Sequence, residues 1–211
     1  MTSDVRDLFV ETARVVEVAI ADDAVGDTWD EPSVLEDQLV GGLAGHLARG
    51  AVWVVDDYLS ADLPDAPSVE SAAGYFAQIM DTATEDDHRL IRERGALIAG
   101  AGQRDLCASL TARLDELEVR LTTEPADRML GVVGGALTMP LDEYLKTRLI
   151  EQVVHLDDLA RSVDREPWPV PFAAQDLVIH IGADIGRIRH GPTEMIRALY
   201  RRRLDPVLPV L

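Results

Sequence analysis

The sequence predicts an all-α fold, an antiparallel helical bundle with additional short helices, and three observations support this prediction. First, hydrophobic residues make up 47% of the chain and aromatic residues only 5%, so the core must be built from Ala, Leu, Val and Ile, which allow close helix packing. Second, apolar residues recur at the i, i+3, i+4 spacing of amphipathic helices. Third, no tract rich in Pro, Gly and Ser interrupts the 211 residues. We therefore expect residues 1–211 to form a single domain.

The first predicted helix covers residues 3–20, where the apolar positions follow a helical rhythm. Thr2, Ser3 and Asp4, at its start, are candidate N-caps, because their side-chain oxygens can accept hydrogen bonds from the free N–H groups of the first turn. A loop is expected over residues 22–33.

The next predicted helix, over residues 39–59, is unusual because four glycines fall within it. Each glycine costs about 1 kcal/mol relative to alanine in a helix, a cost that close approach of a neighbouring backbone or ligand usually offsets. These glycines are Gly41, Gly42, Gly45 and Gly50. After a turn at Pro64 and Pro67, helical patterns predict further helices over residues 69–80, 84–102 and 104–121.

The last third of the chain begins with an ambiguous segment. Residues 128–139 contain β-branched residues and glycines that allow an extended connection as easily as a helix. From Pro140 a helix can run to residue 163 and stop before the proline-containing segment 165–171. Two more helices are predicted over residues 173–191 and 192–203.

The charge and composition exclude several classes of function. The formal net charge is -18 and the isoelectric point is about 4.5, so the surface repels both nucleic-acid phosphates and anionic lipids. The N-terminus lacks a basic, apolar signal sequence, and no run reaches the ~18 to 20 apolar residues of a membrane span. We therefore expect a cytoplasmic protein, a monomer or homodimer, that binds neither nucleic acid nor membrane.

One residue type limits the kinds of metal site that the chain can build. Cys107 is the single cysteine, which excludes an intrachain disulfide and a cysteine-rich zinc cluster. Any metal must therefore be held by histidine and carboxylate side chains. Of the 20 basic residues only Lys146 is a lysine, an arginine bias that points to a GC-rich genome.

Candidate metal ligands occur in the segment IEQVVHLDDLA, where Glu151 and His155 lie four positions apart. Residues at i and i+4 share one face of a helix, so both side chains can point at one atom. A catalytic zinc commonly takes three protein ligands, and His46, on the apolar face of its own predicted helix, is the candidate third ligand. The residue types alone leave open a second interpretation, in which these side chains form satisfied polar contacts in a core.

Two stretches resemble a known family. WDEPSVLEDQLVGGLAGHLARG (29–50) and RLIEQVVHLDDLARS (148–162) resemble the DinB-like metalloenzyme superfamily and, within it, the mycothiol-dependent maleylpyruvate isomerase N-terminal domain family. The resemblance implies a DinB-like antiparallel four-helix bundle that binds a divalent metal, usually zinc (Zn2+), through His46, Glu151 and His155. It also implies an actinobacterial source. The chain departs from many relatives at Gln38, where they have tryptophan eight residues before the first histidine.

The resemblance also implies a chemistry. A metal with an open position lowers the pKa of a bound thiol and makes a thiolate available at neutral pH. The implied function is a thiol-using enzyme of mycothiol-dependent S-transferase or maleylpyruvate isomerase type, whose partners are a low-molecular-weight thiol, mycothiol or similar, and a small electrophilic substrate. Because Cys107 lies beside Leu106 and Ala108 and is expected to be a small buried hydrophobe, the thiol must come from the cofactor. The alternative is a non-catalytic metal-binding or ligand-sensing bundle.

Two further residues are candidates for supporting roles. Asp158, three residues after His155, either holds the second nitrogen of a ligand imidazole or is a solvated charge near the helix end. Arg148, three residues before Glu151, is either the ion-pair partner of that carboxylate or a clamp for a substrate carboxylate. The sequence favours the ion pair.

Overall fold

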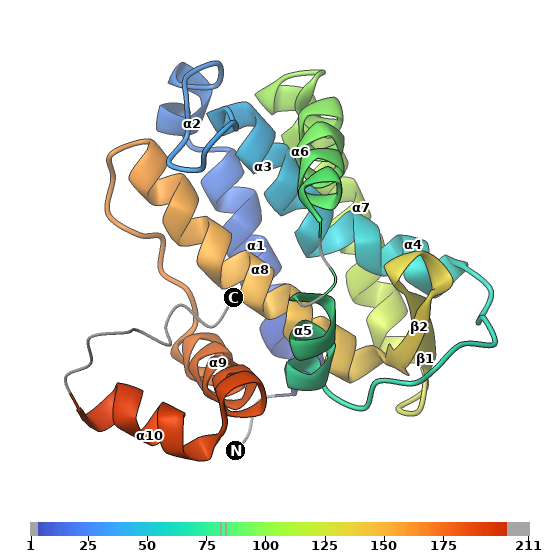
Figure 1. The fold of residues 1–211 in the computed structure, drawn as a ribbon. Helices are drawn as coiled ribbons and strands as arrows, with labels where there is room; N and C mark the ends of the chain where they lie inside the picture. Colours follow the sequence, from blue (N-terminus) through green and yellow to red (C-terminus); the bar gives the residue numbers. More distant parts are fainter. Residues whose placement is uncertain (1–3, 81, 83, 202–211) are drawn as a thin grey trace.

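A computed structural model describes residues 4–80, 82 and 84–201, and confirms the all-α prediction (Figure 1). None of the described helices is long and apolar enough to cross a membrane. The helices are α1 (Val5–Ile20), α2 (Asp23–Asp27), α3 (Val40–Ala48), α4 (Val54–Ser60), α5 (Ala72–Met80), α6 (Glu85–Ala99), α7 (Gln103–Thr123), α8 (Leu141–Ser162), α9 (Phe172–His190) and α10 (Pro192–Tyr200).

Four helical segments make the bundle: α1, α3 with its continuation α4, α7 and α8. Helices α1 and α7 are antiparallel, because Gln103 at the start of α7 donates to the carbonyl of Ile20 at the end of α1. Helices α1 and α8 run in the same direction, since Arg6 pairs with Asp142 where both begin. Figure 1 shows α8 lying across the front of α1 and α3.

The core between these helices is aliphatic, as the composition predicts. Leu110 and Leu114 of α7 and Leu145 and Leu149 of α8 are fully buried, and Phe9 of α1 is the rare aromatic among them. The buried positions recur every three to four residues along each helix, which is the spacing that gives an apolar stripe. The core therefore fixes the rotation of α8 about its axis and, with it, the direction of the polar residues between the leucines.

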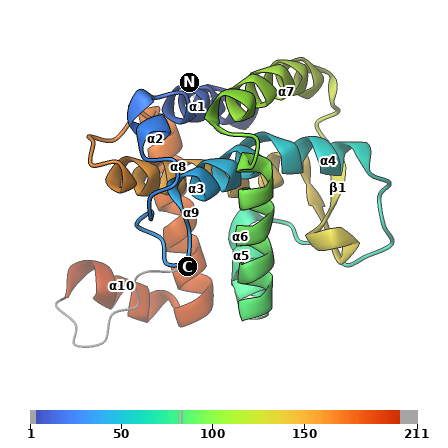
Figure 2. The same cartoon turned by 90° about the horizontal axis from the view of Figure 1, so that it is seen from above.

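Helix α6 crosses α3 at close range. A Cβ atom at Gly45 would lie 2.2 Å from the carbonyl oxygen of Gly95, and a Cβ at Gly95 would lie 2.8 Å from the carbonyl oxygen of Gly42. The backbones can approach this closely only because these positions lack side chains. Figure 2 shows α5 and α6 running across the direction of the bundle helices. The expectation that close approach offsets the helical glycines is confirmed here.

The segment predicted as one helix over residues 39–59 contains a π-helical turn, Arg49–Trp53, between α3 and α4. A π-turn adds one residue to the helical ladder and changes the face on which the following residues lie. The expectation of one regular helix was therefore wrong at this turn. Helical periodicity does not reveal it, because the apolar residues continue on both sides.

The predicted loop over residues 22–33 contains the short helix α2, so that expectation was wrong. Asp22 caps it by accepting a hydrogen bond from the backbone N–H of Ala24, and Val25 is buried against the core. One buried residue is too weak a pattern to predict a five-residue helix. At α1, Asp4 is the N-cap, as predicted, whereas Thr2 and Ser3 lie outside the described residues.

The ambiguous segment 128–139 forms a hairpin. Strands β1 (Met129–Val132) and β2 (Leu137–Pro140) pair antiparallel, with Leu130 opposite Met139. The turn includes Gly134 at a φ of 63°, a conformation that glycine adopts without strain. Helix α8 begins directly after Pro140, as predicted. Of the last predicted helix, residues 192–200 form α10, and residues 202–203 lie outside the described part of the chain.

Candidate metal centre

Helices α3 and α8 bring the three predicted ligands together. His46 lies in the second half of α3, and Glu151 and His155 lie one turn apart in the middle of α8. The π-turn that follows α3 also faces α8, because a Cβ at Gly50 would lie 3.8 Å from the Cβ of Glu151. The close packing of these two helices thus joins residues that are more than a hundred positions apart in the sequence.

The ligand atoms of these residues form a nearly equilateral triangle. The distance from His46 Nε2 to His155 Nε2 is 3.2 Å, and Glu151 Oε2 lies 3.4 Å from His46 Nε2 and 3.5 Å from His155 Nε2. A tetrahedral zinc with bonds of ~2.0 to 2.1 Å separates its ligands by about 3.3 Å. The three atoms therefore match three corners of a zinc tetrahedron, and two imidazoles with one carboxylate form a typical catalytic donor set.

Solvent reaches this cluster. The side chains of His46, Glu151 and His155 are 15%, 23% and 19% exposed. Among the described residues, these are the only three histidine, cysteine or acidic side chains whose ligand atoms come close enough together to hold a metal. The described cluster thus offers three protein ligand atoms, the number that a catalytic zinc site uses, whereas structural zinc sites commonly use four.

The charges around the cluster keep Glu151 ionised. Burial raises the pKa of its carboxyl group, but hydrogen bonds with His155 and His46 and the nearby charge of Arg148 outweigh burial and hold the pKa well below its ordinary value. Burial likewise lowers the pKa of His155, whereas hydrogen bonds with Asp158 and Glu151 raise it to about 9. In the absence of a metal, the His155 imidazole is therefore protonated on both nitrogens at neutral pH.

Asp158 lies against the outer side of His155. Its Oδ2 atom is 3.0 Å from His155 Nδ1, and only 13% of its side chain is exposed. When Nδ1 donates to this carboxylate, the neutral imidazole keeps its lone pair on Nε2, the atom that faces Glu151 and His46. The carboxylate therefore contacts the second nitrogen of the His155 imidazole, which is the geometry that the first of the two interpretations of Asp158 requires.

Arg148 is placed differently from the favoured sequence interpretation. Its guanidinium is buried and lies 4.8 Å from the centre of the Tyr144 ring, and its Nε donates to Thr147. No carboxylate of the described residues lies within ion-pair distance of it, so the expectation of a direct ion pair was wrong. Burial lowers the pKa of Arg148, but Tyr144 and Glu151 raise it above its ordinary value, so the cation persists.

The tyrosines around Arg148 were not identified from the sequence. Tyr58 and Tyr75 lie 5.3 and 6.4 Å from Tyr144, measured between ring centres. Burial raises the pKa of Tyr75 and Tyr144, so both phenols stay neutral. Tyr144 could have been identified from the sequence, because it precedes Arg148 by one helical turn. Tyr58 and Tyr75 belong to α4 and α5, and only the tertiary structure shows that these helices approach α8.

The other candidates considered from the sequence lie outside the cluster. Cys107 is half-buried on α7, and burial and the nearby Glu17 raise the pKa of its thiol, which makes it a poor nucleophile. His88, His180 and His190 are exposed. The structure therefore brings together His46, Glu151 and His155, with Asp158 and Arg148 next to them, and leaves the cysteine apart.

Comparison with known proteins identifies the family of the chain. Neither the curated proteins nor the solved structures include a match to the chain. The mycothiol maleylpyruvate isomerase N-terminal domain family matches residues 5–160. This range includes α1 to α7, all of α8 except its last two residues, and all five residues of the centre, and it stops before α9 and α10. The match covers most of the chain, which therefore belongs to the mycothiol maleylpyruvate isomerase N-terminal domain family.

Proposed function

We propose that the chain is a divalent-metal-dependent, thiol-using enzyme of mycothiol-dependent S-transferase or maleylpyruvate isomerase type. The observation that supports this most directly is the triangle of ligand atoms, 3.2 to 3.5 Å on each side, contributed by His46, Glu151 and His155. Zinc takes two imidazoles and one carboxylate in catalytic sites, so the proposed metal is zinc or another divalent metal. Family membership supports the use of mycothiol or a similar low-molecular-weight thiol.

In this proposal His46, Glu151 and His155 hold the metal. A divalent metal held there would lower the pKa of a bound thiol. It would thereby provide a nucleophile at neutral pH for a small electrophilic substrate. Asp158 fixes the orientation of the His155 ring by accepting a hydrogen bond from Nδ1. Cys107 takes no part, because burial raises the pKa of its thiol.

Arg148 supports the centre through charge. It lies one turn before Glu151 on α8 and lowers the pKa of that carboxyl group. A buried guanidinium keeps its charge at every physiological pH. We propose that Arg148 keeps Glu151 ionised, as a ligand must be, and that the surrounding tyrosines hold the guanidinium in place.

The proposal extends to the setting in which the enzyme works. We propose that residues 1–211 form a single domain, that the protein is a cytoplasmic monomer or homodimer, and that it binds no nucleic acid. The net charge of -18 supports the last point, because such a surface repels phosphate backbones.

The first experiment is elemental analysis of protein purified without added metal or chelator. We expect about one zinc or similar ion per chain, lost in His46→Ala and Glu151→Ala, because two ligands alone hold a metal weakly. His180→Ala is the matched control, since His180 is an exposed histidine on α9, and it should retain the metal. Full metal content in both ligand variants would refute the assignment.

Activity is then assayed on the metal-loaded protein with electrophiles in the presence and absence of mycothiol. Turnover should require the added thiol and should survive Cys107→Ser. Turnover without thiol would refute the proposed chemistry, and bound metal without any thiol-dependent turnover would favour the non-catalytic metal-binding or ligand-sensing bundle.

A further inference from the structure

Arg148 is a buried cation that the helix bundle leaves without a carboxylate partner. It is the most buried charged residue in the part of the chain that the structure describes, with 9% of its surface exposed. Glu151, one turn farther along α8, lies beyond ion-pair distance and, in the proposed function, is a metal ligand. A buried charge is costly unless it is paired, so a partner for this guanidinium has to be found elsewhere.

The hydrogen-bonding groups at the tip of Arg148 are unused. Its Nε atom donates to Thr147 Oγ1 at 3.0 Å, and its guanidinium carbon lies 4.8 Å from the centre of the Tyr144 ring. Within the described residues, Nη1 and Nη2 have no hydrogen-bond partner, and neither atom is enclosed away from solvent. The two nitrogens therefore present a pair of available donors at a point that solvent reaches.

Two tyrosine hydroxyls of the same cluster are also unpaired. Tyr58 of α4 and Tyr75 of α5 lie close to Tyr144, and Figure 1 shows α5 against the first half of α8. Neither hydroxyl has a hydrogen-bond partner among the residues described, and neither is enclosed away from solvent. Burial raises the pKa of Tyr75 and outweighs the charge of Arg148, which lowers it. This phenol therefore stays protonated, and it lies close enough to Arg148 to feel its charge.

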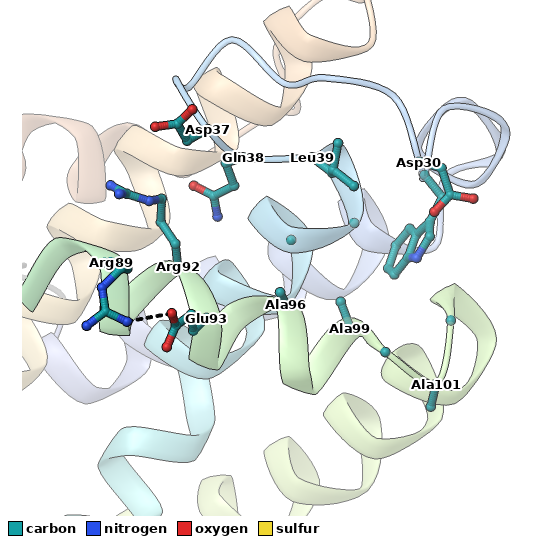
Figure 3. A pocket seen from close by; sticks show the side chains of 15 residues that line it. Asp30, Asp37, Gln38, Leu39, Arg89, Arg92, Glu93, Ala96, Ala99 and Ala101 are labelled. Carbon is teal, nitrogen blue, oxygen red and sulfur yellow. Dashed lines mark hydrogen bonds and ion pairs between the residues drawn. The ribbon is translucent and has the colours of Figure 1, made fainter. Parts of the chain in front are cut away.

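The arginines of a cavity beside α6 differ from Arg148 in this respect. This cavity, of about 710 Å³, lies between the connection over residues 29–39, α3 and α6, and has Arg89 and Arg92 on its rim (Figure 3). Each is paired with a carboxylate of α6, at 2.7 and 2.9 Å respectively. An anion in that cavity would meet cations that are already neutralised, whereas at Arg148 it would meet an unpaired one.

A carboxylate matches the donors around Arg148. The two oxygens of a carboxylate can accept parallel hydrogen bonds from two guanidinium nitrogens, and tyrosine hydroxyls can donate to the remaining lone pairs. Glu151 follows Arg148 by three residues on α8, about 4.5 Å along the helix axis. A molecule held by its carboxylate at Arg148 would therefore have its other end next to the candidate metal ligands.

We propose that Arg148, together with the hydroxyls of Tyr58 and Tyr75, binds a carboxylate of the electrophilic substrate and so selects anionic electrophiles over neutral ones. The inference rests on the proposed function for the presence of an electrophile at the centre. Tyr144 is the platform beneath the guanidinium. Of the two interpretations of Arg148 from the sequence, this is the clamp for a substrate carboxylate, which the absence of an ion pair among the described residues favours.

Binding is tested with crotonate and crotonamide, two planar molecules of similar shape of which only crotonate is charged. Isothermal titration calorimetry is performed on zinc-loaded protein in a buffer without carboxylates. We expect crotonate to bind about 10-fold more tightly than crotonamide, the equivalent of one hydrogen bond between charged groups. Equal affinities for the two molecules, or no detectable binding of crotonate in the millimolar range, would overturn the inference.

Two variants test the donors separately. Arg148→Lys keeps the positive charge near Glu151 but lacks the two-pronged end, so zinc should be retained while the affinity for crotonate falls about 10-fold. Tyr75→Phe keeps the ring and removes the hydroxyl, without changing any charge near the metal ligands. It should lower the affinity for crotonate about 5-fold. The affinity for crotonamide should stay as in the wild type in both variants.

The same two substitutions at exposed positions are the matched controls. Arg161→Lys on α8 and Tyr200→Phe on α10 replace exposed side chains and should bind crotonate as the wild type does. Wild-type affinity for crotonate in both Arg148→Lys and Tyr75→Phe would place the carboxylate elsewhere, for example on the metal, and would overturn the inference.

Turnover separates this inference from the proposed function. Iodoacetate and iodoacetamide are a charged and a neutral electrophile, and each alkylates a thiol: a sulfur–carbon bond forms, the carbon–iodine bond breaks, and iodide and the thiol proton leave. The assay uses metal-loaded Cys107→Ser protein with mycothiol, so that the cysteine of the chain is not alkylated. Tyr75→Phe in this background should raise KM for iodoacetate and leave KM for iodoacetamide unchanged.

The two failures give different results. Thiol-dependent turnover with the same KM for iodoacetate with and without Tyr75→Phe would refute the carboxylate subsite and leave the proposed function standing. Binding of crotonate that depends on Arg148 and Tyr75, without thiol-dependent turnover of either electrophile, would support the subsite and count against the proposed function.

Discussion

At the residue scale, the contact between Asp158 and His155 is the one most open to a quantitative test. We predict that Asp158→Asn lowers metal affinity about 10- to 100-fold, the usual cost of losing a carboxylate behind a ligand imidazole. The measurement is competition with a chromophoric chelator. Arg161 is an exposed side chain that forms an ion pair with Asp158 at 3.7 Å. The Arg161→Ala variant is the control and should bind metal normally. Equal affinities for wild type and Asp158→Asn would contradict this role.

A second prediction at this scale concerns pH. Without metal, the pKa of His155 is about 9, against 6.5 for an ordinary histidine, so between these values the native state binds more protons than the unfolded state. The free energy of unfolding should therefore be highest below pH 6.5 and fall as pH rises to about 9. The contribution of Glu151 is constant in this window, because its pKa is lowered.

Thermal unfolding of chelator-treated protein between pH 6 and 9.5 measures this effect. His155→Gln should remove the decline, since it lacks the titrating group, and bound metal should also remove it by displacing the proton. A midpoint that is constant or rises over the same range in the metal-free wild type would contradict the raised pKa.

Arg148 is tested through its effect on the neighbouring ligand. Removing the buried cation in Arg148→Met should raise the pKa of Glu151, so protons should compete with metal up to a higher pH than in the wild type. Metal titrations at a series of pH values measure the midpoint, which is the pH at which half of the sites hold metal. Tyr144→Phe keeps the ring beneath the guanidinium and should leave the midpoint unchanged. An unchanged midpoint in Arg148→Met would show that the guanidinium does not act on Glu151.

At the element scale, the crossing of α3 and α6 decides whether His46 faces α8. Gly45→Ala would place a Cβ 2.2 Å from the Gly95 carbonyl oxygen, so we predict a loss of about 1 to 3 kcal/mol in the free energy of unfolding. Gly42→Ala, where the nearest side-chain atom is 3.5 Å away, should instead gain about 0.5 to 1 kcal/mol from helix propensity. Urea unfolding compares the two, and equal effects would contradict the close contact.

The same elements show what periodicity predicts. The long helices α1, α7 and α8 were predicted because each buries a repeated apolar stripe, and hydrophobic burial dominates their stability. Helix α2 and the π-turn Arg49–Trp53 were not predicted. Helix α2 buries only Val25, which is too few residues to produce a helical pattern of apolar positions. The π-turn continues the apolar pattern of α3 and α4, so the sequence does not distinguish it from a regular helix.

At the scale of the whole molecule, metal binding should be linked to folding. A metal at 100 times its Kd stabilises the native state by about 2.7 kcal/mol, equivalent to a rise of about 5–10 °C in Tm for a chain of this length. Calorimetry with and without zinc measures the shift. His46→Ala should abolish it, because α3 then contributes no ligand to a site shared with α8. A similar shift in that variant would place the metal elsewhere.

The sequence alone determined the helical class, the order of the long helices and the candidate ligands. These features depend on local patterns: apolar periodicity, and the i, i+4 spacing of Glu151 and His155 on one helix. The tertiary structure alone decided how close His46 comes to that pair, and that Arg148 is buried among tyrosines without an ion pair among the described residues. The first depends on the packing of α3 against α8, and the second on the packing of α4 and α5 near α8. Contacts between segments distant in the sequence are set by how helices pack, which the pattern of a single segment does not predict.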